Sequence, residues 1–208
     1  RALRRFANGP VVKFVSNIDA ADLDEALHGA HPETTLFVIS SKTFTTLETM
    51  HNAERARRWI QTSVPGWPLH FVAATSHTEA ALNWGIQKDR CLEFFDWVGG
   101  RFSLSSVIGF PVMCAIGAEQ FSQFLAGMAD MDSHVVTAPT EHNLPMVHAS
   151  MWWMNSALHS FPTVAVIPYS HDLSRLPAYL QQLIMESNGK SVGVDGCSVL
   201  GGTSPVVW

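Results

Sequence analysis

Few residues of this sequence carry charge and few are cysteine, and both scarcities exclude classes of protein. Charged residues make up 15% of the 208 positions against 47% hydrophobic residues, so the chain can build a packed core and a disordered tail is excluded. The net charge of -5 disfavours binding to nucleic acid. Cys91, Cys114 and Cys197 are odd in number and far apart, which argues against a disulfide framework and predicts a cytoplasmic location.

The sequence also has no long uninterrupted apolar run. Residues 102–118 and 142–171 contain no Asp, Glu, Lys or Arg, but glycine or proline interrupts both stretches, so we expect no membrane span. The zinc-binding patterns H-E-x-x-H and C-x-x-C are missing. His148 and His159 could share a helix face, but we interpret them as core or interface residues and expect no metal.

Short β-branched and aromatic runs alternate with helix-like stretches in the first half of the chain. This alternation predicts an α/β fold in which helices flank a parallel sheet. Strands are expected at 11–16, 35–40, 69–75 and 91–96, and helices at about 19–29, 43–62 and 76–86.

The pattern changes from about residue 104, which predicts a domain boundary near 110–118. Helices dominate this second half and strands return near its end. We expect helices at about 104–135, 144–160 and 173–188, and strands at 163–168, 191–195 and 205–208.

The segment after the predicted strand 35–40 is rich in hydroxyl groups. Ser41, Lys42, Thr43 and Thr46 would meet the free N–H groups of a helix start, which attract an anion such as phosphate. An alternative is a plain capping box formed by Thr45 and Glu48, with the remaining residues in a polar turn. The glycines of a P-loop are absent, so the pattern leaves both interpretations open.

A second candidate is Gly99-Gly100-Arg101, which follows the predicted strand 91–96. Paired glycines let the backbone approach a ligand closely, and an arginine beside an apolar stretch needs a partner. That partner could be a ligand, or it could be Glu93 or Asp96 in a salt bridge.

A third candidate is Glu186, in the segment Met185-Glu186-Ser187-Asn188-Gly189-Lys190. Asn188-Gly189 is typical of a helix C-terminus. A glutamate at that end of a helix is unfavourable against the dipole, so Glu186 is either exposed and harmless or kept there for a task.

Taken together, these segments resemble the glucose-6-phosphate isomerase family. Residues 99–103 are similar to its G-G-R-[FY]-S signature, residues 41–46 to its S-K-T-F-T-T phosphate loop, and residues 185–190 to its M-E-S-N-G-K segment. Their order and spacing also match, as do Thr-Ala-Pro at 137–139 and Asn-Leu-Pro at 143–145. The resemblance covers essentially the whole chain but less than half of the family's length.

The resemblance implies a fold of sugar-isomerase (SIS) type with parts of two such domains, residues 1–113 and 114–208. It implies interconversion of glucose 6-phosphate and fructose 6-phosphate by a homodimer, without cofactor or metal. By resemblance, Glu186 is the base and Arg101 faces the developing negative charge. The residues implied to contact substrate are Ser41, Lys42, Thr43 and Thr46 at the phosphate, with Gln182 and Gly100 near the sugar.

Two segments of the family are missing from this sequence. A G-x-G-G-S segment is expected before Arg1, and a G-T-N-x-Q-H segment and a late catalytic lysine after Trp208. We therefore expect a fragment of a longer protein that is inactive by itself. Ser105, where the family often has Trp, and Leu183-Ile184, where Gly-Asp is common, indicate a divergent member.

Other interpretations stay open at this point. One is a regulatory module of the same fold, which would bind a sugar phosphate without catalysing a reaction. Such a module needs neither Glu186 nor Arg101, so the presence of both residues favours an enzyme. An isomerase acting on another sugar phosphate, or one joined to a second enzyme domain, is a further alternative. The apolar segment 151–154 could lie in the core or at an interface, and its composition favours the core.

Overall fold

The computed structural model describes residues 2–199 and 202–208, which form two compact units. The sheet unit consists of Pro10–Gly99 with Ser103–Ala115. The helical unit consists of Ile116–Trp208 with Arg1–Gly9 and Gly100–Phe102. The assignment of residues 1–113 and 114–208 to two SIS domains stays a prediction.

The sheet unit is built on three parallel strands in the order β1-β2-β3. Phe37 pairs with Phe71 and Ala73 with Cys91, and all five residues of the central strand β2 are buried. Because the strands are parallel, their carboxyl ends lie at one edge of the sheet. Three of the four strands predicted for this half are thereby confirmed, with bounds β1 Phe37–Ser40, β2 Phe71–Thr75 and β3 Cys91–Glu93.

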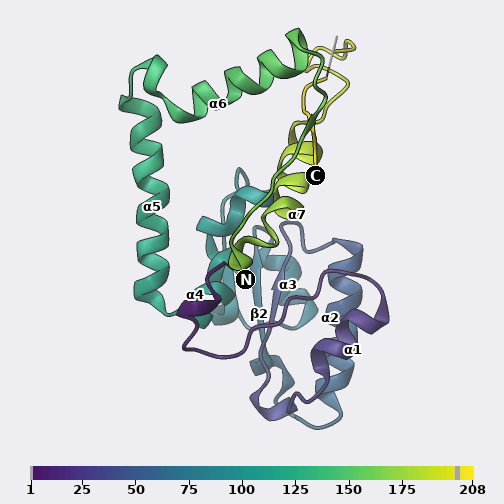
Figure 1. The fold of residues 1–208 in the computed structure, drawn as a ribbon. Helices are drawn as coiled ribbons and strands as arrows, with labels where there is room; N and C mark the ends of the chain where they lie inside the picture. The colour runs from purple at the N-terminus through teal and green to yellow at the C-terminus, as the bar shows by residue number, and fades with distance from the viewer. Residues whose placement is uncertain (1, 200–201) are drawn as a thin grey trace. The chain divides into compact units, whose positions relative to one another are not determined.

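Three helices lie beside this sheet, as Figure 1 shows around β2. They are α1 Ala20–Leu27, α2 Leu47–Gln61 and α3 Thr78–Trp84. The core between helices and sheet includes Ile60 and Phe71, both fully buried. The connections of this unit contain short 3-10 turns: η2 Pro32–Thr34, η3 Trp67–His70, η4 Lys88–Arg90 and η6 Val107–Gly109. A further 3-10 turn, η5 Gly100–Ser105, begins in the helical unit.

The guanidinium of Arg57 joins α2 to α3 in this core. It lies 4.7 Å from the centre of the Trp84 ring and 5.6 Å from that of Trp67, and it donates to the Trp84 carbonyl at 3.2 Å. A guanidinium over an indole ring is a favourable contact when shielded from water. These contacts fix the position of the helix that follows β2.

The strand predicted at 11–16 does not form, so that expectation is wrong. Val11 and Phe14 are 88% and 73% exposed. The segment has strand propensity, but within the described chain no strand pairs with it, and an isolated extended segment has no ladder to hold it.

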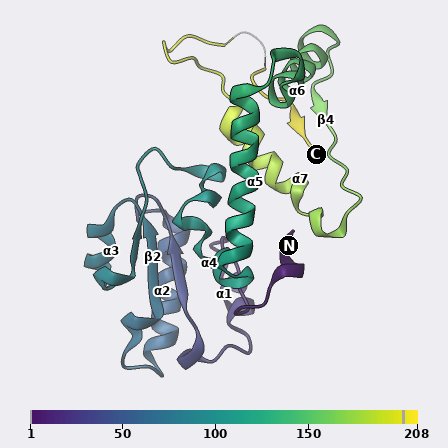
Figure 2. The same cartoon turned by 90° about the vertical axis from the view of Figure 1, so that its left-hand side faces the viewer.

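The helical unit is dominated by α5 Ala118–Thr137 and α6 Leu144–Trp153, and α6 turns sharply away from the end of α5 (Figure 2). Gly117, with φ of +85°, separates α5 from α4 Phe110–Ile116, so the long helix predicted at 104–135 is broken. Asn143 lies at the turn between α5 and α6. Its Nδ2 donates to the Val135 carbonyl at 2.9 Å and its Oδ1 accepts from Met146 N at 3.3 Å. Its side chain thus caps α6 and ties it to α5.

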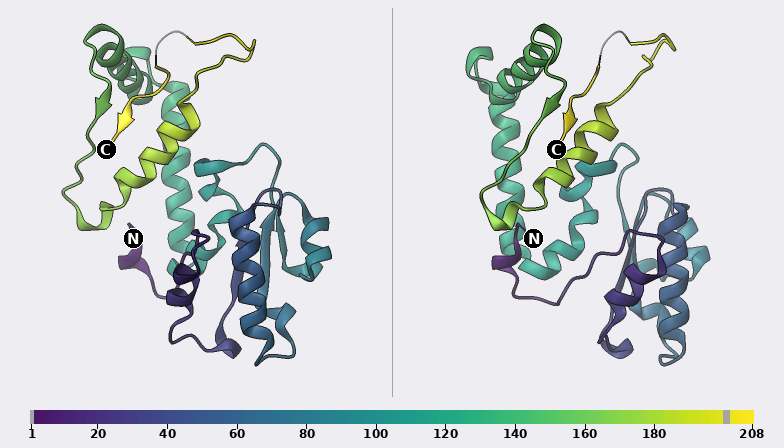
Figure 3. Two further views of the ribbon diagram at one scale, coloured as in Figure 1. Left: turned by 90° about the vertical axis from the view of Figure 1, so that its right-hand side faces the viewer. Right: turned by 45° about the vertical axis from the view of Figure 1, so that its right-hand side comes forward.

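The last segments of this unit form a continuous helical stretch and a two-stranded pair. Figure 3 shows α7 Leu176–Leu180 running directly into the π-helix η10 Gln181–Glu186. Strands β4 Thr163–Val164 and β5 Val206–Val207 pair in parallel, which confirms the two predicted strands in shortened form. The strand predicted at 191–195 is wrong: its Val192 makes only an isolated bridge to Ser198. The remaining short elements are η1 Arg4–Phe6, η7 Thr140–His142, the π-helix η8 Met154–Leu158 and η9 His171–Leu173.

The apolar segment 151–154 does not enter a core in this chain. Met151, Trp153 and Met154 are 56%, 62% and 45% exposed. Apolar residues surround α6 on several sides, and a single neighbouring layer cannot bury them all. The interpretation of this segment as core is therefore wrong for this structure. Among residues 2–199 and 202–208, no helix has the length and apolar character needed to cross a membrane.

Candidate functional site

The phosphate loop, defined here as residues 41–46, leads from β1 into α2 at the carboxyl edge of the sheet. Ser41 is buried, and its Oγ lies 3.1 Å from Thr46 Oγ1, within hydrogen-bond distance. Thr43 Oγ1 and Thr45 Oγ1 form a second hydroxyl pair at 2.7 Å. Four hydroxyl groups are therefore gathered at the start of a 15-residue helix.

The capping box expected as an alternative does not form. Helix α2 begins at Leu47 with Thr46 as its N-cap, and that residue makes no side-chain cap hydrogen bond. Thr45 lies one residue before the cap and pairs with Thr43 instead. The first-turn N–H groups of α2 are thus left without a side-chain acceptor from the cap, which is the condition under which a helix start binds an anion.

The buried side chain of Phe44 anchors this loop to the core. Its side chain is 5% exposed and meets the Trp84 ring edge-on at 6.5 Å, while Lys42 and Thr43 on the loop are exposed. Its φ of +56° is unusual for a bulky residue and costs about 1–3 kcal/mol, which surrounding packing must offset. Burial of the ring therefore holds the loop in a conformation that the chain alone would avoid.

The ammonium of Lys42 reaches the loop that follows β3. Lys42 Nζ donates a hydrogen bond to the backbone carbonyl of Asp96. The side chain is exposed, so the charge stays accessible to a ligand at the same edge of the sheet. The carboxyl ends of β1 and β3 are thereby connected.

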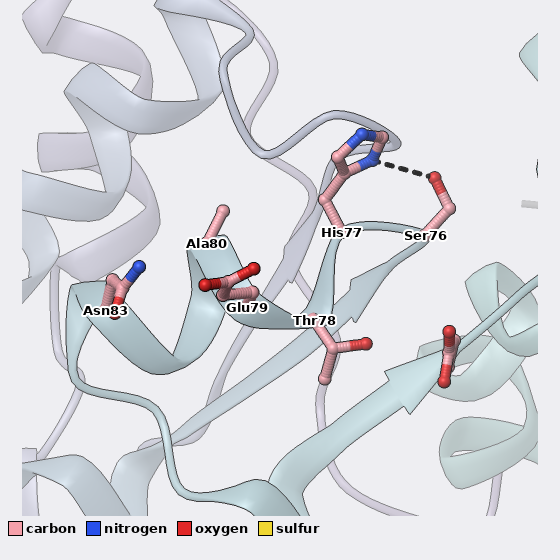
Figure 4. Close-up of a pocket in the computed structure, with 7 residues that line it drawn as sticks. Ser76, His77, Thr78, Glu79, Ala80 and Asn83 are labelled. Atoms are coloured by element: carbon pink, nitrogen blue, oxygen red, sulfur yellow. Dashed lines mark hydrogen bonds between the residues drawn. The ribbon is translucent and has the colours of Figure 1, made fainter.

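Next to this loop, a pocket of about 480 Å³ opens at the carboxyl end of β2 (Figure 4). Its polar lining includes Ser76, His77 and two carboxylates, Glu79 and Glu93. Two carboxylates disfavour a phosphate in this pocket. The remaining lining residues are Thr78, Ala80 and Asn83.

Gly100 and Arg101 begin η5 and belong to the helical unit. Gly100 has φ of +59°, a left-handed conformation that favours glycine. Arg101 is half-buried, and its backbone carbonyl accepts a hydrogen bond from the Tyr179 hydroxyl at 3.1 Å. Tyr179 lies on α7, three residues before Gln182, so the Arg101 segment is joined to the helical stretch that carries Gln182 and Glu186.

Glu186 is the last residue of η10, and π-helical turns are frequent at functional sites. Its side chain is exposed, as is that of Gln182. The backbone around it is fixed: Gly189 N donates to the Met185 carbonyl at 3.1 Å, and Lys190 Nζ donates to the Glu186 carbonyl at 2.6 Å. A Cβ at Gly189 would collide with the Met185 carbonyl oxygen, which explains the glycine at this helix end.

The predicted site residues fall into two groups. Ser41, Lys42, Thr43 and Thr46 gather on one loop of the sheet unit. Gly100, Arg101, Gln182 and Glu186 belong to the helical unit. The alternative of a salt bridge from Arg101 to Glu93 or Asp96 would cross between the units and stays a prediction.

The sequence does not predict the contact between Tyr179 and Arg101. Tyr179 lies 78 residues from Arg101 in the sequence, and no local pattern announces such a contact. The burial of Phe44 could have been expected, since it is the one apolar residue within the polar segment 41–46. Among residues 2–199 and 202–208, no group of three or more His, Cys, Asp or Glu residues is arranged to hold a metal ion, and Cys91, Cys114 and Cys197 are free thiols.

Comparisons with known proteins agree with this architecture. The chain is 47% identical over 209 residues to the glucose-6-phosphate isomerase of Mesorhizobium japonicum, covering 100% of this chain and 38% of that protein. It is 49% identical over 207 residues to that of Jannaschia sp., with the same coverage. The crystal structure of a glucose-6-phosphate isomerase from Chlamydia trachomatis superposes with a TM-score of 0.86 at 38% identity, covering 100% of this chain and 41% of that one.

The chain therefore spans about two fifths of the length of these relatives. The sequence model of one family, phosphoglucose isomerase, matches residues 1–208. This match shows that the chain belongs to the phosphoglucose isomerase family, and the parallel sheet with polar loops at its carboxyl edge is consistent with it.

Proposed function

We propose that the protein containing this chain is an aldose–ketose isomerase that interconverts glucose 6-phosphate and fructose 6-phosphate. The family membership supports this reaction, and the proposed site residues supply groups of the required chemistry. The chain covers 38% of the length of the relatives reported above, so the proposal concerns the full-length protein. A cytoplasmic location and a homodimer are parts of the same proposal.

The phosphate loop is proposed to hold the phosphate group of the substrate. Ser41, Thr43 and Thr46 offer hydroxyl donors, Lys42 offers a positive charge, and the start of α2 offers backbone N–H groups. Each shielded hydrogen bond to a charged group contributes about 1.5–3 kcal/mol. Binding through the phosphate would position the sugar carbons independently of the chemistry.

Glu186 is proposed to move the proton. Its carboxylate removes the proton from C2 of the open-chain aldose and an enediolate forms. The hydroxyl proton passes from O2 to O1, and the carboxyl group returns its proton to C1. Arg101 is proposed to stabilise the negative charge on the enediolate oxygens, because a guanidinium keeps its own proton. Gln182 and the backbone of Gly100 are proposed to contact the sugar. Glu186 is exposed in this chain, so its shielding is proposed to come from bound substrate and the rest of the protein.

One contact carries the proposal more than any other. The Tyr179 hydroxyl joins the Arg101 backbone to α7, the start of the stretch that ends at Glu186. The segment with the guanidinium and the helix with the carboxylate are thus linked within one unit. A module that only binds a sugar phosphate has no need of this arrangement.

Glu186→Gln in the full-length protein tests the assignment. The amide keeps the shape of the side chain but cannot accept the substrate proton, so we expect turnover to fall by at least about 1,000-fold while the affinity for inorganic phosphate changes less than about twofold. The measurements are conversion of fructose 6-phosphate and calorimetric titration with inorganic phosphate. Glu119→Gln, at an exposed glutamate on α5, is the matched control and should behave as wild type.

Near-normal turnover of the Glu186→Gln protein would contradict the assignment of the base. A wild-type protein that binds phosphate but converts neither sugar phosphate would favour the regulatory binding module. Conversion of a different aldose phosphate, in a panel of substrates, would favour an isomerase of other specificity.

A further inference from the structure

The residues at the end of β2 form hydrogen bonds to the phosphate loop at the backbone carbonyl of Lys42. Its oxygen accepts a hydrogen bond from Thr75 Oγ1 at 2.9 Å and from Ser76 N at 3.1 Å. Ser76 Oγ lies 3.0 Å and His77 Nδ1 3.2 Å from the same oxygen, and these two side chains also face each other at 3.1 Å, as the dashed line in Figure 4 marks. A carbonyl oxygen has two lone pairs, so the donors with fixed geometry hold it best.

Thr75 has such a geometry. It is the last residue of the central strand and is fully buried. Its hydroxyl donates to the Lys42 carbonyl and accepts from His77 N at 3.0 Å, so both of its hydrogen-bonding roles are in use. Its backbone is held on the β3 side, where Thr75 pairs with Glu93 and Phe94 N donates to the Thr75 carbonyl at 3.3 Å. Rotation of this hydroxyl away from Lys42 would leave the buried Thr75 O–H without its acceptor.

The orientation of the Lys42 carbonyl determines that of the next amide. The carbonyl of Lys42 and the N–H of Thr43 belong to one planar trans peptide and point in opposite directions. A carbonyl turned toward the loop after β2 therefore turns the Thr43 N–H away from that loop. Phe44, the residue after this peptide, is buried and has a φ of +56°, so its backbone is also constrained.

We propose that Thr75 is a positioning residue that fixes the Lys42–Thr43 peptide of the phosphate loop in the orientation that binds the substrate phosphate. This inference rests on the proposed function, since it assumes that the loop binds phosphate. Thr75 itself is buried and acts through the loop. Ser76 supports the same carbonyl from an accessible position.

The experiment compares Thr75→Val and Thr75→Ser in the full-length protein. Valine keeps the shape of threonine but removes the hydroxyl, so we expect the Kd for inorganic phosphate and the KM for fructose 6-phosphate to rise together by about tenfold, with kcat within about threefold of wild type. Serine restores the hydroxyl and should bring both values to within about twofold of wild type. A role in general stability alone would not produce this split or this rescue.

Two further variants separate the possible failures. Thr35→Val, which removes another hydroxyl-to-carbonyl bond before β1, is the matched control and should leave the phosphate Kd unchanged. Lys42→Ala should abolish phosphate binding, and unaltered binding in that variant would show that the loop is not the phosphate site, which overturns the proposed function as well.

A Thr75→Val protein that folds and binds phosphate like wild type would overturn the inference alone. The same holds if Thr75→Ser remains as impaired as Thr75→Val. If Thr75→Val fails to fold, Ser76→Ala decides the matter: a rise of about threefold in the phosphate Kd supports the inference, and an unchanged Kd overturns it.

Discussion

At the scale of single residues, Phe44 shows how the core shapes the candidate site. Its ring is buried against Trp84 while the flanking Thr43 and Thr45 remain exposed. The left-handed backbone at Phe44 is unfavourable for a bulky side chain, so packing energy maintains the loop conformation. Burial at one residue thus sets the direction of its polar neighbours.

Phe44→Ala should therefore lower the free energy of unfolding by about 3–5 kcal/mol, the usual cost of truncating a buried aromatic ring. Chemical denaturation of the full-length protein measures it. Phe95→Ala is the control, since Phe95 is 68% exposed and its loss should cost less than about 1 kcal/mol. Equal losses in the two variants would mean that Phe44 is not an anchor of the loop.

At the scale of elements, an ion pair ties η1 to η9 within the helical unit. Arg5 donates from its guanidinium to the Asp172 carboxylate. The hydrogen bond from Arg5 lowers the pKa of Asp172 below its ordinary value, and the electrostatic effects of Arg5 and nearby His171 act in the same direction. A carboxyl with a lowered pKa in the folded state stabilises that state once it is ionised.

This contact predicts a pH dependence. Its contribution is fully present above the ordinary pKa of an aspartate, about 3.9, and is lost as the pH falls through the lower pKa of the folded state. Asp172→Asn should therefore unfold at a lower urea concentration than wild type at pH 7, and the difference should shrink toward pH 3. Arg5→Gln should reproduce the loss at pH 7. A difference that stays constant with pH would contradict the ion pair.

The elements also show what the sequence could predict and what it could not. Strands β1, β2 and β3 and helices α1 to α3 follow from local apolar patterns, and they appear close to their expected ranges. Residues 11–16 and 191–195 carry the same kind of pattern without forming strands, because a strand also needs a partner that no local pattern supplies. The break at Gly117 is visible in the sequence only as a glycine inside a long helical run.

The candidate site likewise has features that the sequence predicts and contacts that it does not. The phosphate loop was predictable, because hydroxyls and a lysine follow a strand directly and the motif is contiguous. The contact between Tyr179 and Arg101, and that between Thr75 and Lys42, depend on segments that meet only in the folded chain. The sequence draws attention to Glu186 by its unfavourable place at a helix end, and the structure shows that its side chain is exposed. Its role in proton transfer stays a prediction.

At the scale of the whole molecule, the residues to which we assign roles are divided between the two units. The phosphate loop belongs to the sheet unit, and Arg101 and Glu186 belong to the helical unit. Large apolar side chains on and after α6, such as Trp153, Leu158 and Phe161, are about 60% exposed. The chain spans 38% of its relatives, and we expect the 208 residues alone to show no turnover.

The most direct test of the account follows the transferred hydrogen. The full-length protein is given glucose 6-phosphate that carries deuterium at C2, and NMR measures the deuterium at C1 of the fructose 6-phosphate formed. Transfer through a carboxylate and an enediolate predicts that part of the deuterium reaches C1 and part is lost to water. Complete retention at C1 would indicate a hydride shift and would contradict the role proposed for Glu186.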